Sequence, residues 1–102
     1  MRDENAEARE PPVRCRLRVE GRVQGVGFRA WTAWMARSLG LAGWVRNLPD
    51  GAVELEAGGA AEAVARMRDA VRRGPELASV GRVCDLDAGD GPLPRPFEIR
   101  YR

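Results

Sequence analysis

The chain has 102 residues and a formal net charge of +2, which suits one domain with a single modest core and does not require a nucleic-acid partner. It contains no histidine, and its two cysteines, Cys15 and Cys84, are too few for a zinc site or a disulfide framework. Its N-terminus is charged and no apolar run approaches membrane-spanning length, so we expect a cytoplasmic protein without a signal peptide or membrane segment.

Residues 1–12 differ in composition from the rest of the chain. The segment ends in Pro11-Pro12, and nothing in it can bury an apolar face. Its charged residues are Arg2, Asp3, Glu4, Glu7, Arg9 and Glu10. We therefore expect a disordered N-terminal tail over 1–12 and one folded domain over 13–102.

Two kinds of periodicity follow in the first half of the domain. Apolar residues alternate with charged ones from Val13, which predicts a strand over 13–20 with one buried face. After a glycine-rich loop, apolar residues recur at helical spacing from Phe28 to Leu39, and Gly40 is a suitable C-terminal stop. The sequence therefore predicts a strand, a loop and a helix in this order.

The second half repeats this alternation of strands and a helix. The Pro49-Asp50-Gly51 turn predicts that the second and third strands form an antiparallel hairpin. In order, the patterns predict strands over 41–48 and 52–57, a helix over 60–73, a strand over 80–86, a loop over 87–96 and a last strand over 97–102.

The order βαββαβ with an added terminal strand predicts an α/β (α+β) ferredoxin-like sandwich, in which two helices cover one face of an antiparallel sheet. In this topology the first strand lies between the third and the fourth. Arg14, Arg16 and Arg18 would then face Glu54 and Glu56 across a solvent-exposed sheet face. Such exposed pairs contribute only a few tenths of a kcal/mol each.

The glycine-rich loop between the first strand and the first helix has the features of a phosphate-binding site. Glycines let backbone amides converge, and a helix N-terminus favours an anion. No Ser, Thr, Asp or Asn stands at the helix start to cap it. We expect phosphate to contact the loop amides and the guanidinium of Arg29, whose planar fork fits phosphate oxygens. The candidate phosphate-binding residues are Arg22, Val23, Gln24, Gly25, Val26, Gly27, Phe28 and Arg29.

The sequence offers no convincing covalent nucleophile. Neither cysteine is followed by an arginine at the spacing of a phosphate-binding cysteine loop, and the glycine loop lacks the Gly-Lys-Ser/Thr ending of a magnesium-nucleotide site. Water must then attack, and the substrate must already be activated, as a mixed carboxylic–phosphoric anhydride is. Asn47, at the end of the second predicted strand, can hold such a water because its amide both donates and accepts hydrogen bonds.

Several motifs together resemble the acylphosphatase family over residues 13–101. They are Gly-Arg-Val-Gln-Gly-Val-Gly-Phe-Arg at 21–29, Leu-Gly-Leu at 39–41, Gly-Trp-Val-Arg-Asn at 43–47, Asp-Gly at 50–51 and Phe-Glu-Ile-Arg-Tyr at 97–101. The resemblance implies that Arg29 binds phosphate and Asn47 orients water, without a metal or cofactor. We expect a monomer that hydrolyses a small-molecule acyl phosphate and has no nucleic-acid or membrane partner.

Alternative interpretations of the motifs remain open at this point. The run from Gly25 to Ala30, with Asp50 about twenty residues later, also fits a dinucleotide fingerprint, although the first strand is not buried on both faces as that fold requires. The glycines could simply turn a strand into a helix. A non-catalytic phosphate-binding module, like the acylphosphatase-like domain of a hydrogenase-maturation protein, is the main rival to an enzyme.

Three further points concern residues outside the main motifs. The strand arginines could bind RNA, although the first and third strands show no aromatic residue for base stacking on the open face. Trp31 and Trp34 lie off the apolar stripe of their helix, where they could be partly buried or could grip an acyl group. Cys15 and Cys84 lie on strands predicted to be neighbours, so they could be close together as free thiols.

Overall fold

The computed structural model describes residues 11–101, and Pro11 and Pro12 have no regular structure. A disordered tail was expected over 1–12, and residues 1–10 of that segment lie outside the described residues. The elements are β1 (Val13–Arg22), α2 (Phe28–Ser38), β2 (Ala42–Asn47), β3 (Val53–Gly59), α3 (Ala61–Arg73), β4 (Ser79–Leu86) and β5 (Glu98–Arg100). Every expected helix and strand is present, with ends shifted by no more than a few residues.

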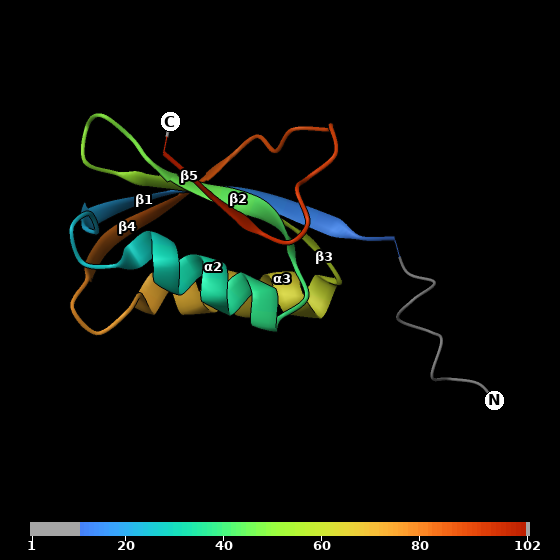
Figure 1. Ribbon diagram of the computed structural model, residues 1–102, viewed down its shortest axis with the longest axis horizontal. Helices are drawn as coiled ribbons and strands as arrows, with labels where there is room; N and C mark the ends of the chain where they lie inside the picture. The colour runs from blue at the N-terminus through green and yellow to red at the C-terminus, as the bar shows by residue number, and fades with distance from the viewer. Residues whose placement is uncertain (1–10, 102) are drawn as a thin grey trace.

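The strands form one sheet in the order β4-β1-β3-β2-β5, and both helices cover the same face (Figure 1). β1 lies between β3 and β4, as predicted, and β2 and β3 form the expected antiparallel hairpin. β5 runs parallel to β2, so the sheet is mixed. This arrangement confirms the ferredoxin-like sandwich and adds the direction of the last strand.

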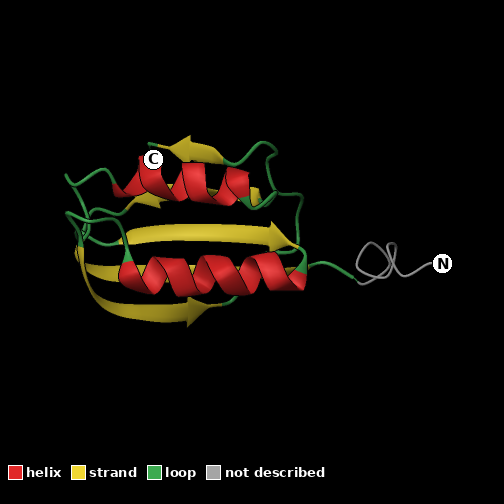
Figure 2. Cartoon of the chain, turned by 90° about the horizontal axis from the view of Figure 1, so that it is seen from below, coloured by secondary structure: helices red, strands yellow, loops and turns green. Residues whose placement is uncertain are grey.

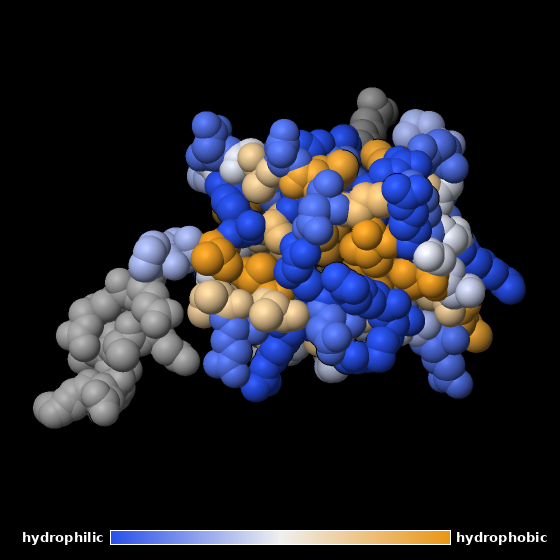
Figure 3. Space-filling model, turned by 180° about the vertical axis from the view of Figure 1, so that it is seen from behind, coloured by the Kyte–Doolittle hydropathy of each residue, from blue (hydrophilic) through white to orange (hydrophobic). Residues whose placement is uncertain are grey.

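The hydrophobic core lies between the helices and the sheet face that they cover (Figure 2). Leu17, Val45 and Leu55 occupy the centre of three adjacent strands and are at most 1% exposed. Met67 and Val71 of α3 pack into the same cluster. On the side seen from behind, hydrophobic patches are separated by hydrophilic residues (Figure 3). No described helix is long and apolar enough to cross a membrane.

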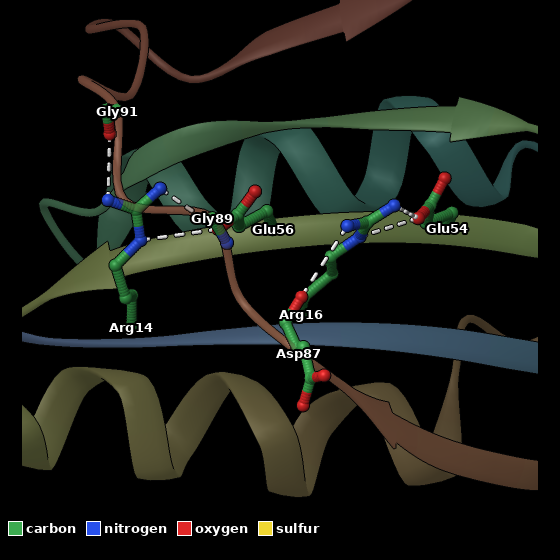
Figure 4. Close-up of polar contacts among 7 residues, drawn as sticks. All are labelled: Arg14, Arg16, Glu54, Glu56, Asp87, Gly89 and Gly91. Carbon is green, nitrogen blue, oxygen red and sulfur yellow. Dashed lines mark hydrogen bonds and ion pairs between the residues drawn. The ribbon is translucent and has the colours of Figure 1, made fainter.

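The opposite sheet face is not the solvated surface expected from its alternating charges, because Glu54 and Glu56 are only 3% and 5% exposed. Arg14 pairs with Glu56 at 2.9 Å, and Arg16 and Arg46 both pair with Glu54. The 87–96 segment crosses this face, where the Gly89 amide donates to Glu56 and the Gly91 carbonyl accepts from Arg14 (Figure 4). The expectation of exposed pairs was therefore wrong for both glutamates.

Arg18 also departs from its expected pairing. Its guanidinium contacts Glu20 and Asp50 instead of Glu54 or Glu56. The alternating pattern identifies which side chains share a sheet face, but it does not show which loop crosses that face or where a long guanidinium side chain ends. These depend on contacts between residues far apart in the sequence.

The two cysteines lie on opposite faces of the sheet, so the expectation that they could be close is wrong. Cys15 belongs to the buried cluster under the helices, whereas Cys84 pairs in register with Arg18 on the other face. Both thiols are free. Burial raises the pKa of the Cys15 thiol, although Arg68 opposes that shift.

Replacing Glu54 with Gln should destabilise the fold by about 2 kcal/mol, because Arg16 and Arg46 would lose the carboxylate that they share. Burial alone raises the pKa of Glu54, but the bonds from Arg46 and Arg16 outweigh it and the net pKa lies below the usual 4.5. The ion pairs of Glu54 with Arg16 and Arg46 therefore stabilise the fold above pH 4.5. Their contribution disappears as the pH falls through the lowered pKa of Glu54. Urea denaturation of both proteins between pH 7 and pH 3 measures this difference.

The matched control is Glu62→Gln, which removes the carboxylate of an exposed i,i+4 pair with Arg66 and should change stability by less than about 0.5 kcal/mol. Equal effects of the two substitutions at neutral pH would contradict a stabilising role for the buried network. So would a difference between wild type and Glu54→Gln that grows as the solution becomes more acidic.

Candidate active site

The pairing of β1 with β4 changes register just before the loop that leads from β1 to α2. This irregularity lies between Glu20 and Gly21, and a Cβ on Gly21 would lie 2.3 Å from the Ser79 carbonyl oxygen. The loop then passes through left-handed conformations at Gly25, with φ of 75°, and Gly27, with φ of 79°. These backbone angles need glycine, so the three glycines set the path of the loop.

The loop presents backbone N–H groups without partners inside the described chain. Within residues 11–101, the amides of 23–28 donate no hydrogen bond to another loop, turn or side-chain group. The N-cap of α2 is Gly27, which provides no side-chain cap, and the first turn of α2 contains no acidic residue. An anion at this helix N-terminus would therefore meet several free donors and a favourable helix dipole.

Gln24 anchors the loop to the hairpin turn between β2 and β3. Its side-chain amide donates hydrogen bonds of 2.8 Å to the carbonyl oxygens of both Leu48 and Ala52. Gln24 was predicted among the phosphate-binding residues, whereas its contact with the hairpin turn was not predicted. The available signal was that Gln24 has the only polar side chain between Arg22 and Arg29.

A cavity of about 180 Å³ lies between this loop, the end of β2 and β5. Arg29, in the first turn of α2, and Asn47, the last residue of β2, both line it, although they are eighteen residues apart in sequence. The lining residues are Val23, Gly25, Gly27, Phe28, Arg29, Ala30, Asn47, Ile99 and Tyr101. The structure thus brings the two candidate catalytic residues together.

Not every predicted phosphate-binding residue lines this cavity. Arg22 is exposed at the end of β1, Val26 packs against the core, and Gln24 makes its contacts with the hairpin turn. In these three residues only the backbone amides remain candidates for phosphate binding. Within the first helix, Trp31 packs edge-on against Phe28, which agrees with simple partial burial.

β5 and the residue that follows it provide two side chains beside the cavity, Ile99 and Tyr101, that were not predicted as site residues. The Arg29 guanidinium carbon lies 4.6 Å from the centre of the Tyr101 ring, and Ile99 forms part of the cavity wall. A ring face beside a guanidinium restrains it without neutralising its charge. Among the described residues, no carboxylate lies within ion-pair distance of Arg29. Its positive charge therefore remains available to an anionic ligand.

The cavity chemistry is that of an oxyanion site with a neutral polar group beside it. One permanent cation and converging amides can bind a tetrahedral phosphoryl group, while the Asn47 amide can hold a water molecule. No lining side chain is a carboxylic acid, a thiol or an imidazole. Among residues 11–101, no three acidic or cysteine side chains gather closely enough to hold a metal ion.

A family model described as acylphosphatase matches residues 15–99. This chain belongs to the acylphosphatase family. It is 54% identical over 86 residues to an acylphosphatase of Nitratidesulfovibrio vulgaris strain DP4, with 82% of this chain and 86% of the relative covered. The identity to an acylphosphatase 2 of Ralstonia nicotianae is 49% over 88 residues, covering 86% and 93% of the two chains.

Solved structures support the same assignment. The crystal structure of the acylphosphatase from Bacillus subtilis aligns with a TM-score of 0.80 at 36% identity, covering 86% of this chain and 98% of that chain. The family resemblance inferred from the motifs is therefore confirmed, and so is the fold. The matched region includes the acylphosphatase loop, the helix that follows it and the β2–β3 hairpin.

Replacing Gln24 with Ala should lower the affinity of this acylphosphatase for inorganic phosphate about fivefold. Both bonds that hold the loop against the hairpin turn would be lost, so phosphate would have to order the loop on binding. Isothermal titration calorimetry measures the affinity. Ser38→Ala, which removes one exposed bond to Met35, is the control and should bind phosphate as wild type does. An unchanged affinity in Gln24→Ala would show that the anchor does not shape the site.

Proposed function

We propose that this chain hydrolyses acyl phosphates to a carboxylate and inorganic phosphate, by direct attack of a water positioned by Asn47 on a phosphoryl group bound to Arg29 and the loop amides. The observation that carries the residue assignment is the common cavity of Arg29 and Asn47, beside a loop whose amides have no internal partner. Membership of the acylphosphatase family supports the reaction class.

Phosphate binding depends on the fixed donors of the loop. The guanidinium of Arg29 gives two parallel N–H groups to the phosphoryl oxygens, and the backbone amides between Arg22 and Phe28 supply the others. Because these donors are already in place, they need not reorganise as negative charge redistributes during phosphoryl transfer. Gln24 keeps the donors at a constant position relative to Asn47 through its bonds to the hairpin turn.

The chemical step requires the water and the leaving group to lie on opposite sides of phosphorus. The side-chain oxygen of Asn47 accepts a hydrogen bond from the water, which orients a water lone pair toward phosphorus. A P–O bond forms to the water oxygen, the P–O bond to the acyl group breaks, and the carboxylate leaves with its electron pair. Since no lining side chain is a base, a phosphoryl oxygen takes the water proton.

We also propose a monomer that acts in the cytoplasm without a nucleic-acid partner. The three β1 arginines that could form an RNA-binding stripe are already paired with carboxylates of Glu56, Glu54, Glu20 and Asp50. Engagement of these guanidiniums supports a structural role for that face. RNA affinity that survives moderate salt would contradict this part of the proposal.

The experiment that tests the function measures carboxylate release from benzoyl phosphate, in the presence of a chelator, for wild type and Arg29→Gln. We expect rapid turnover that needs no added metal and disappears in the variant, because Arg29→Gln removes the cation from the cavity. Turnover that persists in the variant would place the reaction elsewhere. A wild type that binds inorganic phosphate without turnover would instead be a non-catalytic phosphate-binding module.

Replacing Asn47 with Ala should lower kcat about a hundredfold while leaving the affinity for inorganic phosphate nearly unchanged. The substitution removes the group that orients water and leaves the phosphate donors in place. Steady-state kinetics and phosphate titration on the same preparation separate the two effects. If Asn47→Ala turns over as fast as wild type, or loses phosphate binding to the same extent as kcat, Asn47 does not have the assigned role.

A further inference from the structure

A second cavity adjoins the proposed phosphate site on the side formed by α2 and β5. It is an open groove of about 450 Å³, lined by Ala30, Ala33, Trp34, Arg37, Ser38 and Ile99. Ala30 and Ile99 also line the cavity of Arg29 and Asn47, so the two spaces share part of their walls. α2 and β5 lie next to each other in the fold, as the view from below shows (Figure 2).

The groove follows one face of α2 away from the phosphate site. Ala30, Ala33, Trp34 and Arg37 are three, four and seven residues apart, which places them on the same side of the helix. From Ala30 to Arg37 the helix rises about 10 Å. The groove therefore starts beside Arg29 and is long enough for a ring of the size of benzene.

The groove wall is mainly apolar, and each of its two polar side chains, Arg37 and Ser38, makes one hydrogen bond to a backbone carbonyl oxygen. The Ser38 hydroxyl donates to the Met35 carbonyl oxygen, and the Arg37 Nε donates to the Phe97 carbonyl oxygen at 2.8 Å. The second bond also ties α2 to the residue before β5, so the two sides of the groove are held together. Trp34 is 64% exposed, which leaves a large aromatic surface open to a ligand.

We propose that this groove is the acyl subsite of the reaction assigned above, that Trp34 is its specificity-determining residue, and that the protein favours acyl phosphates with an aromatic acyl group. The inference rests on the proposed function. In-line attack requires the acyl group to point away from the water held by Asn47, and Asn47 does not line the groove. An acyl ring leaving the phosphate site past Ala30 and Ile99 meets the Trp34 side chain.

The dimensions and polarity of the two spaces indicate which acyl group the groove would bind. The phosphate cavity, at about 180 Å³, is bounded by the loop and by Arg29, and it suits the phosphoryl group and the water. The adjoining groove offers two alanines, an isoleucine and an indole, which favour an apolar planar group over a short polar one. An acetyl group would be too short to reach Trp34, so its turnover should not depend on this residue.

The test compares kcat/KM for benzoyl phosphate and acetyl phosphate in wild type, Trp34→Ala and Trp34→Phe. Trp34→Ala should lower kcat/KM for benzoyl phosphate about tenfold, mainly through a higher KM, because a ring-stacking partner is lost. The kcat/KM for acetyl phosphate should stay within about twofold of wild type, since the short acetyl group makes little contact with the groove. Trp34→Phe should retain most of the benzoyl preference, because the ring surface is kept.

Leu86→Ala is the control, since it also removes an exposed apolar side chain but on the sheet face that the helices do not cover. Leu86→Ala should leave kcat/KM unchanged for both substrates. Equal losses for both substrates in Trp34→Ala, or no loss for benzoyl phosphate, would overturn the acyl subsite. A wild type that hydrolyses neither substrate would overturn the proposed function and this inference with it, whereas normal hydrolysis with no effect of Trp34→Ala would overturn the inference alone.

Discussion

The site depends on the strand directions, which bring three distant segments to one end of the sheet. β1 and β2 are both antiparallel to β3, so the loop after β1 and the turn after β2 lie at the same end. β5 runs parallel to β2 and therefore delivers Tyr101 to that end as well. The two hydrogen bonds of Gln24 then fix the loop against the hairpin turn. A last strand running in the opposite direction would leave Arg29 without its aromatic neighbour.

The residues that could be predicted from the sequence carry their chemistry in their own type and position. Arg29 closes a glycine-rich loop, and Asn47 precedes a turn, so local patterns suffice to select both as candidates. Tyr101 was missed as a site element, and Gln24 was predicted to bind phosphate without its contact to the hairpin turn, because both depend on contacts across the fold. The parallel register of β5 and the reach of a side chain to another hairpin have no short-range signal in the sequence.

The charged sheet face shows the same limit of prediction from sequence. Alternation correctly placed Arg14, Arg16, Glu54 and Glu56 together, but it did not predict that the 87–96 segment crosses this face and that its Gly89 amide bonds to the buried Glu56. The consequence is a separation of roles between the two regions. Charges on the sheet face neutralise one another within the structure, whereas the guanidinium of Arg29 faces a cavity lined by no carboxylate. Binding of an anion therefore competes with no ion pair at the site.

A site without a carboxylate, thiol or imidazole limits the reactions that it can catalyse. Such a site can stabilise negative charge and orient the reacting groups, but none of these side chains is there to take a proton from water. It therefore suits substrates whose leaving group departs readily. A carboxylate leaving from an acyl phosphate meets that requirement. Selectivity among acyl phosphates must then come from outside the phosphate cavity, where the leaving group lies. The groove between α2 and β5, proposed here as the acyl subsite, can provide it because it adjoins the cavity of Arg29 and Asn47.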